Sequence, residues 1–158
     1  MMPKSIQIRA GGAELIGLTK PLWEKQKTYH LGIDRLSPEN YVDLSFEERA
    51  IRIQKKGAHL TTLLAEDRTT DHLIGYSLAT INLEGVGEID SVFVEENYRG
   101  KGVGTALIKA TLVWMEENKV QKTKLHVLDV NQSAVSLYRT LGFEPRMVEM
   151  IRRPSDPE

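Results

Sequence analysis

The chain has 158 residues and a mass of 17.9 kDa, which is the usual size of one domain and enough to bury a hydrophobic core. Hydrophobic residues make up 41% of it and charged residues 27%, which argues against a disordered or membrane protein, and the net charge of −1 gives no basic surplus for nucleic acid or an anionic membrane. The absence of cysteine excludes disulfides, thiolate metal sites and a cysteine nucleophile, and no stretch has the pattern of a signal peptide or membrane span. We therefore expect one cytoplasmic domain over residues 1–158.

The N-terminal third is predicted to contain one strand followed by helices. Alternating apolar residues indicate a short strand over Ser5–Arg9. Apolar residues at helical spacing cover Glu14–Tyr29, and Pro21 within them predicts either two helical pieces or one kinked helix. A Ser-x-x-Glu capping box predicts another helix that begins after Ser45 and ends at Gly57.

From residue 60 the pattern changes to strands. Leu60–Glu66 and Leu73–Asn82 flank a polar stretch, which predicts a β-hairpin, and Glu88–Val94 follows a glycine turn as a third strand. From Val103, apolar residues recur at positions i, i+3, i+4 and i+7, which indicates the clearest amphipathic helix of the chain.

The C-terminal part is predicted to form a strand, a helix and a last strand. Lys124–Val130 has the apolar content of a strand, Ser133–Leu141 follows as a short helix ended by Gly142, and Phe143–Ile151 completes the pattern. Hairpins come first in the chain and strand–helix–strand units come later. This order predicts an α/β fold with a mixed sheet and helices on both faces.

The densest chemical signal lies between the strand Glu88–Val94 and the amphipathic helix. Residues 99–104 read Arg-Gly-Lys-Gly-Val-Gly and open that helix, where unpaired N–H groups and the positive end of the helix dipole attract anions. The glycines allow close approach of the backbone, and Arg99 and Lys101 add positive charge. Strand, glycine-rich loop and helix together predict a cradle for a phosphate or pyrophosphate.

Two well-known phosphate cradles do not fit this spacing. A P-loop needs two glycines five positions apart followed by Lys and then Ser or Thr, which Gly100–Thr105 does not supply. A dinucleotide fingerprint needs Gly-x-Gly-x-x-Gly, and Gly104 comes one position too early for it. The remaining alternative is a flexible loop whose glycines only turn the chain, which the two cations and the helix start argue against.

Two motifs resemble those of the GCN5-related N-acetyltransferase (GNAT) superfamily. Arg99-x-x-Gly102-x-Gly104 matches its acetyl-CoA loop, Q/R-x-x-G-x-G/A, and residues 131–143 match its second signature, N-x-x-A-x-x-L-Y-x-x-x-G-F. The resemblance covers residues 60–151, the expected sheet and acetyl-CoA-binding core. Residues 1–57 fit only as the N-terminal strand and the variable helices on the acceptor side.

The resemblance implies the GNAT fold, with a mostly antiparallel sheet, and acetyl-CoA as co-substrate. It implies that backbone groups of Val92 and Val94 pair with the pantetheine arm like an added strand, that the amides of residues 99–104 hold the pyrophosphate, and that Asn131 contacts the pantetheine arm. The full set expected at acetyl-CoA is Val92, Phe93, Val94, Arg99, Gly100, Lys101, Gly102, Val103, Gly104, Thr105, Asn131 and Tyr138.

The resemblance also implies two catalytic residues, Tyr138 as general acid beside the thioester sulfur and Glu88 as general base through water. Acetyl transfer to an amine needs an acid and a base, and a tyrosine with an ordinary pKa of about 10 suits a thiolate leaving group. Without cysteine, direct transfer in a ternary complex is the simplest mechanism. The alternatives are that Tyr138 only packs, that Asn131 only caps a helix, and that Glu88 and Asp90 are solvated surface.

The acceptor is expected to be a primary amine of a small cationic molecule, such as a polyamine, amino sugar or aminoglycoside. A protein N-terminus or lysine is the second choice, and a non-catalytic acyl-CoA sensor is the alternative of another class. Residues 34–48 carry five carboxylates against the single Arg35, which is either a solvated segment or an acidic rim that attracts a cation. We expect no metal site, nucleic acid or membrane partner; a homodimer is a family-level expectation.

Overall fold

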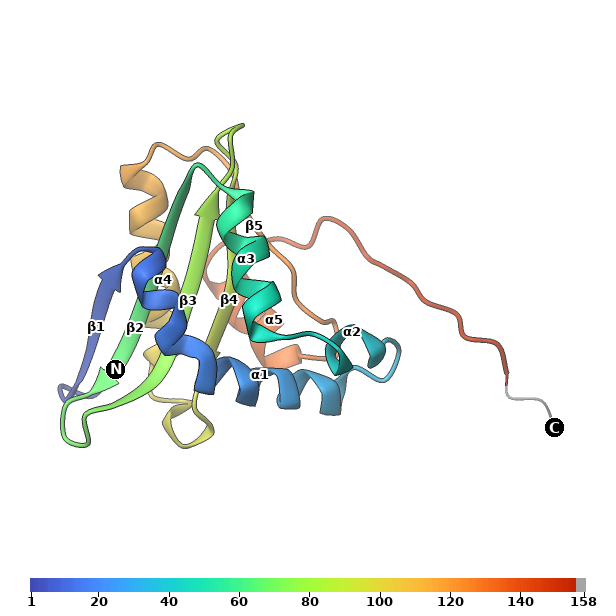
Figure 1. Cartoon of the computed structure of the whole chain (residues 1–158), viewed down its shortest axis with the longest axis horizontal. Helices are drawn as coiled ribbons and strands as arrows, with labels where there is room; N and C mark the ends of the chain where they lie inside the picture. The colour runs from blue at the N-terminus through green and yellow to red at the C-terminus, as the bar shows by residue number, and fades with distance from the viewer. Residues whose placement is uncertain (156–158) are drawn as a thin grey trace.

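A computed structural model describes residues 1–155 of the chain. Its strands form one five-stranded sheet in the order β1-β2-β3-β4-β5 (Figure 1). Neighbouring strands from β1 to β4 are antiparallel and β5 is parallel to β4, which confirms the expected mixed, mostly antiparallel sheet. The strands are β1 (Ile6–Gly11), β2 (His59–Asp67), β3 (His72–Ile81), β4 (Gly87–Val94) and β5 (Thr123–Leu125).

Helices cover both faces of this sheet, as expected. In Figure 1, α1 and α3 lie in front of the strands and α4 lies behind them. Within residues 1–155, no helix combines the length and apolar character needed to cross a membrane. The helical elements are η1 (Ala13–Thr19), α1 (Lys20–Ile33), α2 (Glu39–Val42), α3 (Phe46–Lys56), η2 (Glu96–Tyr98), α4 (Val103–Glu117) and α5 (Gln132–Thr140), of which η1 and η2 are 3₁₀ helices.

Alternation along β2 explains why the sheet has an apolar layer on each face. Leu64 joins a buried cluster with Trp23 of α1 and Ile53 of α3. Its neighbour Leu63 points the other way and joins a cluster with Leu107 of α4. Successive strand residues face opposite sides, so the adjacent apolar residues Leu63 and Leu64 pack against helices on both faces. The sheet is therefore the middle layer of the fold. Helices cover its two faces, which leaves the strand edges free to form a site.

The N-terminal helices follow their sequence signals. The stretch predicted as two pieces or one kinked helix is two pieces, η1 and α1, and Pro21 lies in the first turn of α1. A proline is tolerated there because its missing N–H would have no helical partner. Ser45 caps α3, accepting a hydrogen bond from the Glu48 backbone N–H at 3.1 Å. The short α2 was not predicted, because four residues carry no measurable periodicity.

Two C-terminal predictions were wrong. The strand predicted over Lys124–Val130 is limited to the three residues of β5, and the last strand predicted over Phe143–Ile151 does not form. Residues 143–155 instead run away from the sheet without regular structure (Figure 1). A strand needs a neighbouring strand that forms hydrogen bonds with its backbone N–H and C=O groups. The edge strand β5 has three residues and offers few such groups. Pro145 removes one further donor.

Candidate functional site

The sheet opens between β4 and β5. The two strands pair only from Gly87 to Ile89 of β4, and beyond that point they separate. The carbonyl of Val92 accepts a hydrogen bond from Nε2 of Gln26 at 3.0 Å, and that of Val94 accepts one from Nε of Arg99 at 2.9 Å. Both carbonyls therefore point away from β3, into the opening. The edge of β4 has the polarity that an added strand would need.

A β-bulge and a buried polar group shape this edge. Leu78 of β3 lies opposite Ser91, whereas Ala79 lies opposite Ile89, so Asp90 is the extra residue of the bulge. Beside it, the hydroxyl of Ser91 donates to Oε1 of Gln26 at 2.9 Å. Oε1 of Gln26 also accepts from the hydroxyl of Tyr76, a fully buried residue, at 2.5 Å. These bonds hold the Gln26 amide with its nitrogen toward Val92.

The glycine-rich loop has the backbone conformation that glycine permits. Gly100 and Gly102 have φ values of +74° and +80°, a region that L side chains rarely adopt. Gly102 is the N-cap of α4, so the free N–H groups of the first helical turn begin directly after it. A Cβ atom at Gly102 would lie 3.2 Å from the backbone nitrogen of Met2. The loop is therefore both a tight turn and an anion-facing helix start.

One cavity of about 400 Å³ joins the loop, the open strand edge and α5. Lys101 lies outside its wall: the ammonium is 5.5 Å from the ring centre of Tyr98. The cavity is lined by every other residue of the set predicted to bind acetyl-CoA: Val92, Phe93, Val94, Arg99, Gly100, Gly102, Val103, Gly104, Thr105, Asn131 and Tyr138.

Tyr138 is fixed in this wall by the end of α5. The helix stops in a Schellman motif, in which the N–H of Phe143 bonds to the carbonyl of Tyr138 at 3.0 Å and that of Gly142, at φ +91°, to the carbonyl of Arg139 at 3.1 Å. The ring of Phe143 then packs edge-on against that of Tyr138, with centroids 5.9 Å apart. Burial raises the pKa of the Tyr138 hydroxyl, which therefore keeps its proton at neutral pH.

The glycine-rich loop at a helix start, the open strand edge and the cavity-lining tyrosine are features that the GNAT resemblance predicts together. The family model described as the acetyltransferase (GNAT) family matches residues 22–143. The chain belongs to this family.

Curated GNAT relatives match part of the chain. The uncharacterized N-acetyltransferase YobR of Bacillus subtilis is 37% identical over 70 residues, which are 44% of this chain and 28% of YobR. A mycothiol acetyltransferase of Mycolicibacterium gilvum is 34% identical over 86 residues, which are 51% of this chain and 28% of that protein. The chain thus spans less than a third of the length of either relative.

Solved structures show the same GNAT fold over nearly the whole chain. The PaiA N-acetyltransferase of Thermoplasma acidophilum, in complex with coenzyme A, superimposes with a TM-score of 0.69 and 20% identity, covering 92% of this chain and 93% of that one. Identity at this level supports the fold assignment alone.

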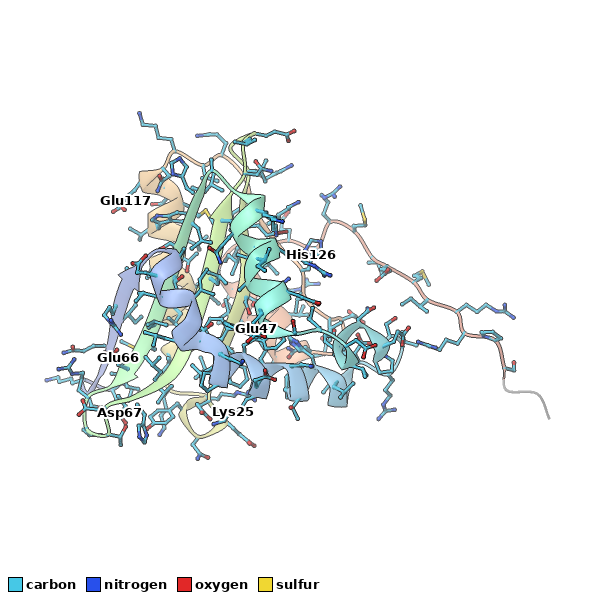
Figure 2. The ribbon with its side chains drawn as sticks, viewed as in Figure 1. Lys25, Glu47, Glu66, Asp67, Glu117 and His126 are labelled. Atoms are coloured by element: carbon cyan, nitrogen blue, oxygen red, sulfur yellow. The ribbon has the colours of Figure 1, made fainter. Side chains whose placement is uncertain are left out.

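Glu88, the predicted GNAT base, lies outside the cavity wall. Its carboxylate and that of Asp90 both contact the ammonium of Lys56 on α3. The Glu88 carboxylate is also 4.0 Å from Nζ of Lys124 and 3.6 Å from Nδ1 of His126. Figure 2 shows His126 beside α3 at this end of the sheet. Glu88 thus lies beside two lysine ammonium groups and the imidazole of His126.

Asn131 caps α5 and also lines the cavity. Its Oδ1 accepts a hydrogen bond from the N–H of Ala134 at 3.4 Å, which caps α5, and the residue also lines the cavity. The capping prediction is confirmed, and the contact with a pantetheine arm stays a prediction.

Sequence reasoning missed the wall that α1 contributes. Gln26, Tyr29 and His30 of α1 line the cavity together with the glycine loop and the β4 edge. The Arg99 guanidinium is enclosed between the rings of Tyr29 and Phe93, at 5.1 and 5.2 Å from their centres. The spacing i, i+3, i+4 puts the three α1 residues on one helix face, but the same spacing serves core residues, so it gave no signal of function.

The acidic segment 34–48 is largely engaged within the chain. Asp34 accepts hydrogen bonds from the backbone of Leu36 and Ser37 and from the hydroxyl of Tyr41. The other two engaged carboxylates, Glu39 and Glu47, pair with Arg153 and Lys20. Asp43 and Glu48 remain exposed. No group of three or more metal-ligating side chains is found among residues 1–155.

Proposed function

We propose that this chain transfers the acetyl group of acetyl-CoA directly to a primary amine, with Tyr138 as general acid. One observation carries the proposal: a single cavity is lined by the glycine loop, by the open edge of β4 and by Tyr138. Pyrophosphate at the loop, the pantetheine arm at Val92 and Val94, and the sulfur at Tyr138 would follow one continuous path along this wall.

Each part of the wall supplies one step of the chemistry. The amides after Gly102 bind the pyrophosphate, and the β4 edge aligns the thioester. The lone pair of the amine forms a bond to the acetyl carbon, and the carbon–sulfur bond breaks with its electrons left on sulfur. Tyr138 then donates its proton to this thiolate. Its raised pKa supports the role, because the hydroxyl stays protonated until a base is formed beside it.

For the acceptor we propose a small cationic molecule with a primary amine. The support is local charge: Asp43 and Glu48 are exposed on the acidic segment, whose helices α2 and α3 contact α1. A peptide N-terminus or lysine is the second acceptor class, and Glu88 acting through water is the base that the GNAT resemblance predicts. A cytoplasmic location and a homodimer also stay predictions.

The test is release of free CoA from acetyl-CoA, detected with a thiol-reactive dye over a panel of polyamines, aminoglycosides, amino acids and short peptides. The lack of protein cysteines keeps the background low. Tyr138→Phe should lower kcat by about 100-fold and leave the Kd for acetyl-CoA within about twofold, because only the acid is lost. Tyr98→Phe is the matched control, since that hydroxyl bonds to Asp67 at 2.8 Å, away from the cavity.

The outcomes separate three cases. Turnover on one class of amine identifies both the activity and the acceptor. No turnover, together with a rise in Tm on adding acetyl-CoA, would point to an acyl-CoA sensor. No turnover and no rise in Tm would overturn acetyl-CoA binding altogether.

A further inference from the structure

His30 lies in the cavity but has no part in the chemistry described so far. It is on the α1 wall, half-buried, and lines the same cavity as Tyr138 and Val92. Among residues 1–155, no hydrogen bond engages its imidazole, so a ring nitrogen is available to a bound molecule. It is the one histidine of the described chain that lines this cavity.

The proposed reaction needs a base on this wall, and Glu88 is poorly placed to supply one. An attacking amine must lose a proton as its bond to the acetyl carbon forms. Glu88 does not line the cavity, and its carboxylate is in contact with Lys56. A carboxylate paired with a cation is a weaker base, because protonation would break the pair.

The surroundings of His30 favour a neutral imidazole. Burial lowers the pKa of His30; the positive charge of Arg49 on α3 acts in the same direction, and Asp34 after α1 opposes both. Two aromatic rings flank the imidazole, Tyr29 on α1 at 6.0 Å and Tyr41 on α2 at 5.7 Å between centroids. An imidazole that is neutral at pH 7 can accept a proton at once.

We propose that His30 is the general base that takes the proton from the acceptor amine; this inference rests on the proposed function above. The nitrogen–carbon bond forms, the carbon–sulfur bond breaks, the amine proton passes to His30 and the proton of Tyr138 passes to sulfur. The products are the amide and free CoA, and exchange with solvent returns both side chains to their starting state. One cavity would then hold both the base on α1 and the acid on α5.

The experiment measures the pH profile of kcat/KM for the amine at saturating acetyl-CoA, corrected for ionisation of the amine itself. His30→Gln should lower kcat by about 100-fold and remove the acid limb of the profile, with the Kd for acetyl-CoA unchanged. His59→Gln is the matched control, because His59 is exposed at the far end of β2. Glu88→Gln, measured in parallel, should retain the acid limb.

A second measurement is made on the unmodified chain, so that it does not depend on the variant folding. The pKa of His30, followed by NMR in complex with a non-hydrolysable acetyl-CoA analogue, should lie below 6.5 and match the acid limb. The role of His30 is overturned if the two values differ, or if His30→Gln keeps the limb while Glu88→Gln loses it. An unmodified chain that is inactive on every amine would instead refute the proposed function, and the role of His30 with it.

Discussion

The two ends of β4 differ sharply although they belong to one strand of eight residues. At the N-terminal end, which we call the closed end, Glu88 pairs with β5 through its backbone, and its carboxylate contacts Lys56 of α3. At the C-terminal end, Val92 and Val94 pair with β3 on one side but have no strand on the other, and their carbonyls bond to side chains that line a cavity. Charged side chains gather at the closed N-terminal end of β4, whereas the open C-terminal end presents backbone carbonyls.

The difference teaches how a short neighbour creates a site. β5 pairs with β4 over three residues only, and the bulge at Asp90 begins directly after that pairing ends. A longer β5, as the sequence predicted, would form hydrogen bonds with the backbone groups of β4 that are now open to a ligand. The closed end then acts as an anchor that fixes where the strands separate, and the open end provides the binding surface.

The largest effect is expected at the open end, from Gly102→Ala. Gly102 has φ +80°, and a Cβ atom there would lie 3.2 Å from the nitrogen of Met2. The loop should shift, so the affinity for acetyl-CoA should fall at least about tenfold, and left-handed strain should cost about 1–2 kcal/mol of stability. Titration calorimetry and urea unfolding measure the two effects.

The control for this variant is Gly85→Ala. Gly85 also has φ +80°, but it lies in a remote turn and a Cβ atom there meets nothing within 4 Å. It should lose similar stability and keep full affinity. Equal losses of affinity in both variants would mean that general destabilisation is the cause, and that the loop is no cradle.

A smaller effect is expected at the closed end, from Lys56→Met. Its ammonium contacts both Glu88 and Asp90, so its removal leaves two carboxylates close together, with Lys124 near Glu88 as the remaining ammonium. The free energy of unfolding should fall by about 1–2 kcal/mol, between the values for exposed and buried pairs. Adding Asp90→Asn should recover part of the loss, because the repulsion is relieved while Thr80 keeps an acceptor. Lys55→Met, on the same helix, is the control for urea unfolding.

The closed end and the open end were predictable from sequence to different degrees. The open end depends on Gly100, Gly102 and Gly142, whose positive φ values are backbone properties that glycine itself signals. Tyr138 was predicted because it belongs to the GNAT signature over residues 131–143, which can be read directly from the sequence. The pairing of Lys56 with Glu88 joins residues 32 positions apart, and no local pattern encodes it.

The α1 wall and the C-terminal segment were beyond local patterns for a further reason. Gln26 and His30 reach the cavity because η1 and α1 pack across the sheet, which depends on the tertiary contacts of Trp23 and Leu22. Phe143–Ile151 alternates well enough for a strand, but pairing needs a partner edge, and the three residues of β5 do not provide it.

The smallest effect is a change of stability with pH that arises from His30 at the open end. Burial holds the pKa of His30 below its ordinary value in the folded state, so the unfolded chain binds more protons as the pH falls. The contribution of His30 is therefore fully present above pH 6.5, the unfolded pKa, and is lost as the pH falls through the lower folded pKa. The loss cannot exceed about 1.4 kcal/mol per pH unit.

Urea unfolding between pH 7.5 and 5 should show a steeper decline of the unfolding free energy in the unmodified chain than in His30→Gln, and His59→Gln should follow the unmodified chain. Parallel curves for all three would show that the His30 imidazole is as well solvated in the folded chain as in the unfolded one, which would contradict its place inside the cavity wall.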